Sequence, residues 1–408
     1  MDRTPRTDWR TPTVMLAAGA ALLAISLGIR HTFGLFLAPM SRDNGWTREV
    51  FALAMAIQNL VWGAAQPFAG RIADRFGAGK TILAGALLYV AGLVMMASSH
   101  TAAALTWAGL LVGLGLSGTT MAVVFGAVAR STPPSRRSLA FGVAMAVGSL
   151  GQFAMLPGAL SAIETIGWAT TLLALAALGA AMAPLSSALF ERPAAPTPGE
   201  RTLSFREVLA EALSHRGFWL LSFGFFVCGF HVVFIATHLP AYLADRGLSA
   251  KTGAVVLALV GLFNVGGSYV AGLLGGRMSK PGVLVAIYGL RAVVIAAFVT
   301  VPLTETTAYA FGAAMGLLWL STVPLTNGTV AAVFGVTNLS TLGGVVFFFH
   351  QIGAFLGGWL GGRIYVMTGS YDAVWWISVG LGVAAALFNV PVREVPVARL
   401  RAVPEIAS

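Results

Sequence analysis

Long apolar segments separated by short polar ones make up most of the chain. A transmembrane helix needs about 20 mainly apolar residues, and the sequence has six such segments in its first half and six in its second. They lie near 14–40, 50–72, 80–99, 103–129, 138–160, 167–190, 217–241, 251–275, 282–302, 307–333, 341–366 and 371–391. This pattern predicts an all-α membrane protein with twelve transmembrane helices embedded in a lipid bilayer.

A polar, proline-containing segment divides the predicted helices into two sets of six. A shift of 202 residues brings parts of the two sets into register, since Arg75 aligns with Arg277 and Gly151 with Gly353. Repeated halves are common in transporters, so we expect two pseudo-symmetric six-helix bundles. The expected organisation is an N-terminal tail (1–13), an N-terminal bundle (14–190), a linker (191–216), a C-terminal bundle (217–391) and a C-terminal tail (392–408).

Composition supports the membrane interpretation and excludes other classes. Apolar residues make up 57% of the chain and charged residues 10%, whereas a soluble domain carries about 25% charged residues. The net charge of +10 comes from basic residues scattered among short loops, so we expect no nucleic-acid partner. A single cysteine, Cys228, allows neither a disulfide within the chain nor a cysteine-based metal site. We expect no metal, no cofactor and a monomer.

The distribution of basic residues predicts the orientation of the protein in the membrane. Eighteen of the 25 lysines and arginines fall in the tails and in loops on the side of the tails, and five fall on the other side. Because short cytoplasmic loops carry the excess of Lys and Arg, both termini and the linker should be cytoplasmic, in the cell (inner) membrane. The remaining two, Arg30 and Arg291, lie inside predicted spans.

The loop after the second span has a distinctive sequence, Gly70-Arg-Ile-Ala-Asp74-Arg75-Phe-Gly77-Ala-Gly-Lys80. It resembles the signature loop of the major facilitator superfamily, and that resemblance implies a cytoplasmic gate. We expect Asp74 to accept hydrogen bonds from free amides at the start of the third helix, and Arg75 and Lys80 to pair across the gate. The second half keeps Arg277 but has Gly276 in place of the acid. The alternative is a loop whose charges only orient the protein.

Two segments of the first half resemble a narrower group. The run from Arg136-Arg137 through Gly148-Ser149-Leu150-Gly151 is similar to the start of the fifth helix in monocarboxylate transporters. Segment Gly34-Leu-Phe-Leu-Ala-Pro-Met40, with Gly45-Trp46, is similar to that family and to oxalate–formate exchangers. One feature departs from the resemblance. That family's functional arginine is on the eighth helix, whereas here the eighth span has none and Arg291 is in the ninth.

The charges predicted inside the membrane are all positive. Each of the 15 acidic residues can be placed in a loop, a tail or a span end, whereas Arg30 lies inside the first span. A buried arginine costs about 2.5–3.5 kcal/mol at a helix centre and usually faces a cavity or a partner, so we expect Arg30 to bind an anionic substrate. The alternative is that Arg30 bonds to helix-end carbonyls. Further candidates for the substrate site are polar side chains predicted at similar depth: His31, Gln152, His231, Asn264, His350 and Gln351.

Two of the interior candidates have structural alternatives of equal weight. His350 shares a helix face with small residues, which could instead form a packing seam between helices. Arg291 lies on a helix that is peripheral in this fold, so it could be either structural, packing with Tyr288, or part of the substrate site.

These features favour a secondary transporter of a small organic anion, with a monocarboxylate as the favoured substrate and alternating access as the mechanism. A proton could be carried by an interior histidine, because imidazole titrates near neutrality, or the anion could be exchanged for another. Multidrug efflux is the alternative, although we find no interior acid. We expect no enzyme activity, because neither a phosphate-binding loop nor paired carboxylates occur, and His231 and His238 lack a third metal ligand.

Overall fold

The computed structural model describes residues 9–190 and 203–401, and all regular elements within these ranges are helices. The N-terminal half contains α1 (Pro12–His31), η1 (Thr32–Phe36), α2 (Leu37–Asn44), α3 (Arg48–Phe76), α4 (Ala78–Ala97), α5 (Ala102–Thr119), α6 (Met121–Ser131), η2 (Pro134–Arg136), α7 (Arg137–Ile166), α8 (Trp168–Ala180), α9 (Met182–Ser186) and η3 (Ser187–Leu189). The C-terminal part contains α10 (Phe205–Ser214), α11 (Arg216–Asp245), α12 (Ala250–Gly275), α13 (Lys280–Thr300), α14 (Glu305–Leu318), α15 (Thr322–Phe334), α16 (Leu339–Thr368), α17 (Asp372–Asn389) and α18 (Ala398–Arg401).

The predicted all-helical membrane architecture is confirmed. Eleven helical segments in the described residues are long and apolar enough to cross a membrane. The twelfth span is α3, which has 29 residues but is less apolar because it carries Gln58, Asn59, Gln66 and several charges near its end. Asn59 and Gln66 have hydrogen-bond partners on other helices, whereas the buried side-chain amide of Gln58 bonds to no described residue.

The fourth and tenth spans are each interrupted at an equivalent place. The fourth consists of α5 and α6, which meet at Thr120, and the tenth of α14 and α15, which are separated at Trp319–Ser321. The 202-residue shift found in the sequence places Thr119 on Ser321. The two interruptions therefore coincide to within about one residue under the repeat, which supports a relation between the halves.

Side chains from other helices bind the backbone groups that the break in the tenth span leaves free. Arg291 of α13 is fully buried, and its guanidinium donates to the carbonyls of Leu318 and Trp319. Asn264 of α12 accepts from the Leu320 amide at 3.0 Å. An unpaired buried backbone group costs about as much as a lost hydrogen bond, so Arg291 and Asn264 stabilise the break.

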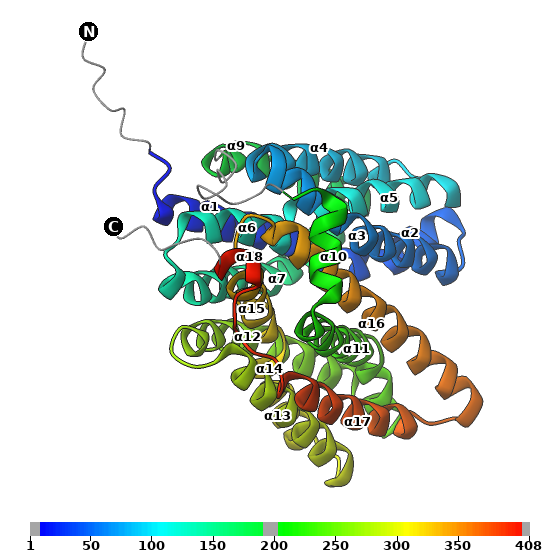
Figure 1. Cartoon of the computed structure of the whole chain (residues 1–408). Helices are drawn as coiled ribbons and strands as arrows, with labels where there is room; N and C mark the ends of the chain where they lie inside the picture. Colours follow the sequence, from blue (N-terminus) through cyan, green and yellow to red (C-terminus); the bar gives the residue numbers. More distant parts are fainter. Residues whose placement is uncertain (1–8, 191–202, 402–408) are drawn as a thin grey trace.

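The halves meet mainly through two helix pairs, α3 with α16 and α7 with α12, and to a smaller extent through α6 with α16 and α7 with α15. In Figure 1 the N-terminal bundle lies above the C-terminal one. Glycine allows the close approach in the second pair: a Cβ added to Gly142 would lie 2.6 Å from the Cα of Gly272. Glycines at such crossings let helix backbones pack closely inside a membrane.

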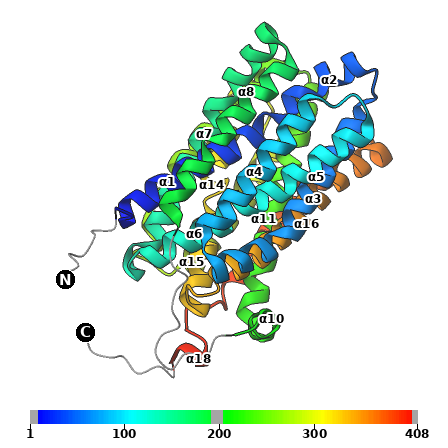
Figure 2. The same cartoon turned by 90° about the horizontal axis from the view of Figure 1, so that it is seen from above.

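The segment between the bundles ends in a short helix, α10, which begins with a capping box formed by Ser204 and Glu207. Figure 2 shows α10 and α18 at the end of the molecule where α1 begins, with α2 at the opposite end. We refer to the former as the termini end. α10 is attached to the N-terminal bundle because Phe205 packs on Phe68 of α3, with ring centroids 5.7 Å apart. It is attached to the C-terminal bundle through Arg399, which pairs with Glu211 at 3.3 Å and donates to the Phe334 carbonyl of α15.

Candidate functional site

Arg30 lies in the last turn of α1, about midway along the first span, which runs from Pro12 to Asn44. Its Nη2 donates to Oδ1 of Asn59 on α3 at 2.8 Å, and its guanidinium carbon is 5.7 Å from the centre of the Phe33 ring. The buried Nε has no hydrogen-bond partner. Among the described residues Arg30 forms no ion pair, so its charge is balanced only by a neutral amide and an aromatic ring.

Asn59 connects Arg30 to the C-terminal half. While its side-chain oxygen accepts from Arg30, its backbone oxygen accepts from Nε2 of Gln351 on α16 at 3.1 Å. Gln351 Oε1 is in turn 3.3 Å from Nδ1 of His350. Three predicted site residues, Arg30, Gln351 and His350, are thus joined through Asn59 into one polar chain across both halves. We call these four residues the central polar chain.

The other predicted site residues lie outside the central polar chain. His31 follows Arg30 directly and is exposed. His231 is fully buried in α11, with its Nε2 2.8 Å from the backbone oxygen of Ser378 on α17. Asn264 donates to the Ser149 hydroxyl of α7 at 2.8 Å, and so joins the halves at their second seam. Gln152 is buried in α7, one residue after the close contact between Gly151 and Ala24 of α1.

His350 is buried against α11. Its ring packs on Phe225 at 4.8 Å and on Phe347 at 5.4 Å between centroids. The neighbouring small residues Gly353 and Gly357 lie against backbone oxygens of α11. These glycines therefore form a packing seam, and His350 reaches the central polar chain from the edge of that seam.

Asp74 joins the halves at the termini end, and the expectation that it bonds to the start of the next helix is wrong. Its carboxylate accepts from the Ser340 amide at 3.2 Å and from the Thr341 amide and hydroxyl, both at 2.7 Å. These groups belong to the first turn of α16, whose positive end favours an acid. Arg130 of α6 donates to the same carboxylate at 3.0 Å. Asp74 therefore fastens α3 and α6 to α16.

The other residues of the loop motif support this junction in different ways. Gly70 lies so close to the Ser340 backbone that a Cβ would overlap it, and Gly77 has φ 97°, a conformation that favours glycine. Arg75 and Lys80, predicted to pair across the gate, are exposed, and the Arg75 guanidinium lies 5.2 Å from the Phe76 ring centre. Arg277 is also exposed.

Sequence reasoning missed the roles of Asn59, Arg71 and Arg130. Arg71 crosses the junction, donating to Asn338 Oδ1 at 3.0 Å and to the Leu203 carbonyl at 2.9 Å. Asn59 is one of three amide side chains on α3, with Gln58 and Gln66, and nothing in the sequence distinguishes it from the other two. Its importance follows from packing against α16, about 290 residues later in the chain.

Comparison with known proteins gives consistent results. Residues 14–358 match the model of the Major Facilitator Superfamily. The chain is 25% identical to the uncharacterized MFS-type transporter YcxA of Bacillus subtilis, covering 95% of this chain and 96% of that one. It is 27% identical to human monocarboxylate transporter 11, covering 90% and 80%. It is 22% identical to the oxalate:formate antiporter of Oxalobacter formigenes, covering 94% and 93%.

Among solved structures, the fold is similar to that of FucP, a Major Facilitator Superfamily transporter crystallised in the outward conformation. The TM-score is 0.75 at 15% sequence identity, covering 92% of this chain and 97% of FucP. Three findings lead to one conclusion: the paired six-helix halves, the signature loop that joins them, and the family match over most of the chain. The protein belongs to the Major Facilitator Superfamily, a family of membrane transporters rather than enzymes.

Proposed function

We propose that this transporter moves a small organic anion, with monocarboxylates as the favoured class, and that Arg30 binds the carboxylate. The observation that carries the proposal is the uncompensated charge of Arg30 at mid-depth. It has only the Asn59 amide oxygen as a hydrogen-bond partner, and no ion pair with any described residue. An anion entering from water would supply the missing charge.

The chemistry of the guanidinium suits a carboxylate. Arginine has five N–H donors in a planar fork that can bind two carboxylate oxygens at once. Only Nη2 is engaged by a described residue, and the buried Nε has no partner. A hydrogen bond to a carboxylate would therefore give the Arg30 Nε donor a partner, which favours binding of the anion.

Two kinds of relative support the substrate class. The chain aligns over most of its length with a protein named monocarboxylate transporter 11 and with one named oxalate:formate antiporter. Both names specify small carboxylates. The cationic centre of this chain gives a physical reason why a similar substrate would bind here.

The arrangement of the helices in two bundles fits a mechanism of alternating access. The described contacts between α3 and α16 run from Asp74 at the termini end to Asn59 at mid-depth, so the substrate would reach Arg30 from the opposite end. Because basic residues concentrate at the termini end, we infer that this end is cytoplasmic and the protein resides in the cell membrane. His31 or His350 could carry a coupled proton; exchange for a second anion would need neither.

Uptake into proteoliposomes tests the proposal with Arg30→Gln against wild type, using radiolabelled formate, lactate and oxalate. Loss of a charged hydrogen bond costs about 1.5–3 kcal/mol, which corresponds to an increase of about ten- to 150-fold in KM. Arg30→Lys should retain part of the activity because it keeps the charge. Arg42→Gln removes an exposed charge from the same span and serves as the matched control. Wild-type uptake by Arg30→Gln would overturn the assignment.

A further inference from the structure

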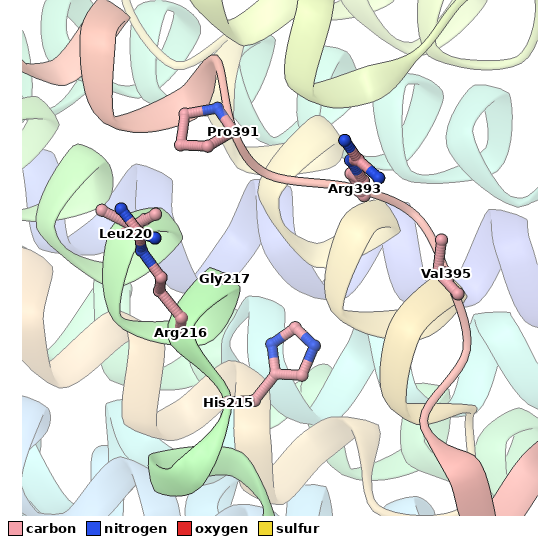
Figure 3. A pocket seen from close by; sticks show the side chains of 7 residues that line it. All are labelled: His215, Arg216, Gly217, Leu220, Pro391, Arg393 and Val395. Carbon is pink, nitrogen blue, oxygen red and sulfur yellow. The ribbon is translucent and has the colours of Figure 1, made fainter.

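A pocket at the termini end of the C-terminal bundle is lined by three basic side chains. It lies where α11 begins and α17 ends, has a volume of about 270 Å³, and is bordered by His215, Arg216 and Arg393 (Figure 3). This is near the lower end of ordinary ligand pockets, which span about 300–1,000 Å³. The rest of its lining is glycine, proline, leucine and valine, so the lining contains no acid.

The positive charge of this pocket is not neutralised by the described part of the protein. Arg216 and Arg393 form no hydrogen bond or ion pair through their side chains with any residue in 9–190 or 203–401. The nearest acid in sequence, Glu394, is held by Lys280 at 2.7 Å. Glu211 of α10 is likewise held by Arg399.

His215 contributes a fixed polar group at the pocket wall. Its ring packs edge-on against Phe334, with centroids 5.4 Å apart, and lies against Gly217, where a Cβ would be 2.9 Å from its Cε1. The buried Nδ1 has no hydrogen-bond partner in the described part of the chain. His215 is the N-cap residue of α11, and its side chain caps none of the backbone amides of that helix. The first amides of α11, which have no partner within the helix, therefore lie at the same place.

The surface beside the pocket is apolar and faces outward. Trp219 and Phe223, one and two turns into α11, stack at 5.9 Å, and Phe223 also contacts Phe388 of α17 at 6.3 Å. Leu387 of α17 and Val390, which directly follows this helix, are each 63% exposed. A cationic pocket directly beside an exposed apolar surface matches the two parts of a phospholipid.

We propose that this pocket binds the phosphate of an anionic phospholipid, whose acyl chains lie along α11 and α17. The two arginines and His215 would contact the phosphate oxygens, and basic pockets at this membrane surface are suited to such headgroups. Basic residues serving only to orient the protein would need no pocket and no adjoining apolar surface. The inference is independent of the transported substrate.

Thermal unfolding of the purified full chain in neutral detergent, followed by tryptophan fluorescence, tests this proposal. Phosphatidylglycerol, phosphatidylcholine and inorganic phosphate are titrated separately at matched ionic strength. We expect saturable stabilisation by phosphatidylglycerol alone. Because each arginine contributes about fivefold to binding of an anionic lipid, Arg216→Gln with Arg393→Gln should weaken apparent affinity about 25-fold.

A matched double variant, Arg136→Gln with Arg206→Gln, removes the same charge from exposed positions outside the pocket and should keep wild-type affinity. Equal affinity in all three proteins would overturn the proposal. So would stabilisation by inorganic phosphate with none from phosphatidylglycerol, since the ligand would then be a free anion. If the pocket double variant does not fold, Arg393→Gln alone, outside any helix, should still lower affinity about fivefold.

Discussion

Replacing Asn59 by aspartate changes its side-chain amide into a carboxylate. The substitution tests whether the positive charge of Arg30 is what binds the substrate. Asn59 Oδ1 already accepts from Arg30 Nη2 at 2.8 Å, so an aspartate of nearly the same shape would form an ion pair in the same place. The site would then be neutral before any substrate arrives. An incoming carboxylate would have to compete with a fixed one for the same guanidinium.

The magnitude follows from the separation of the charges. Two unit charges about 4 Å apart interact with about 4 kcal/mol at an effective dielectric constant near 20. Arg30 and Asn59 are both partly exposed, so we expect about half of this value to act against the substrate. About 2 kcal/mol corresponds to an increase of about thirtyfold in apparent KM.

The assay is uptake of labelled formate and lactate into proteoliposomes, comparing Asn59→Asp with Asn59→Leu. The leucine variant also loses the amide but introduces no charge, so its KM should rise much less. A wild-type KM for Asn59→Asp would refute the assignment of Arg30 to the anion. An equal rise in KM in both variants would show that Asn59 acts through packing rather than through charge.

Three further predictions concern the junction and the core. Asp74→Asn removes the charge from the group that accepts from Ser340 and Thr341 across the junction, and a hydrogen bond to a charged group contributes about 1.5–3 kcal/mol. Spin labels at Arg136 and Met278 should therefore move apart in distance measurements, and unchanged distances would contradict this. Gly70→Ala should push the two halves apart at the termini end, because a methyl group would overlap a backbone oxygen of α16; the distance between labels at Arg136 and Met278 should increase, and an unchanged distance would count against this. Arg291→Leu removes the guanidinium that donates to two buried carbonyls, of which that of Trp319 keeps a long bond of 3.8 Å from Cys228 Sγ. At about 1–3 kcal/mol for each carbonyl, the melting temperature should fall markedly, and Arg291→Lys should recover part of the loss.

The helices could be predicted closely because their physical cause is local. A run of apolar residues must be long enough to cross the bilayer, and the expected segment 251–275 differs by one residue from the observed α12, Ala250–Gly275. The interruptions at Thr120 and at Trp319–Ser321 were not predicted. Proline gives no guide, since Pro67, Pro157 and Pro240 lie inside unbroken helices.

The candidate site could be predicted only in part. Arg30 is conspicuous in the sequence because an arginine in an apolar segment is costly and usually faces a cavity or a partner. The partners of such residues depend on packing between distant parts of the chain: Gln66 and Trp62 of α3 bind Thr120 at the first interruption, and Asp74 binds the start of α16. No local pattern specifies these pairs, because each helix presents several polar residues at similar depth.

The linker helix α10 has a mechanical consequence. It is tied to one bundle through Phe68 and Arg71 and to the other through Arg399, whose Nη2 also donates to the Phe334 carbonyl at 3.2 Å. If the termini end opens during transport, at least one of these attachments must break, so we expect α10 to favour the conformation in which this end is closed. Changes in a segment far from the substrate should then alter the balance between uptake and release rather than the choice of substrate, which the ratio of influx to efflux rates in an Arg71→Gln variant would measure.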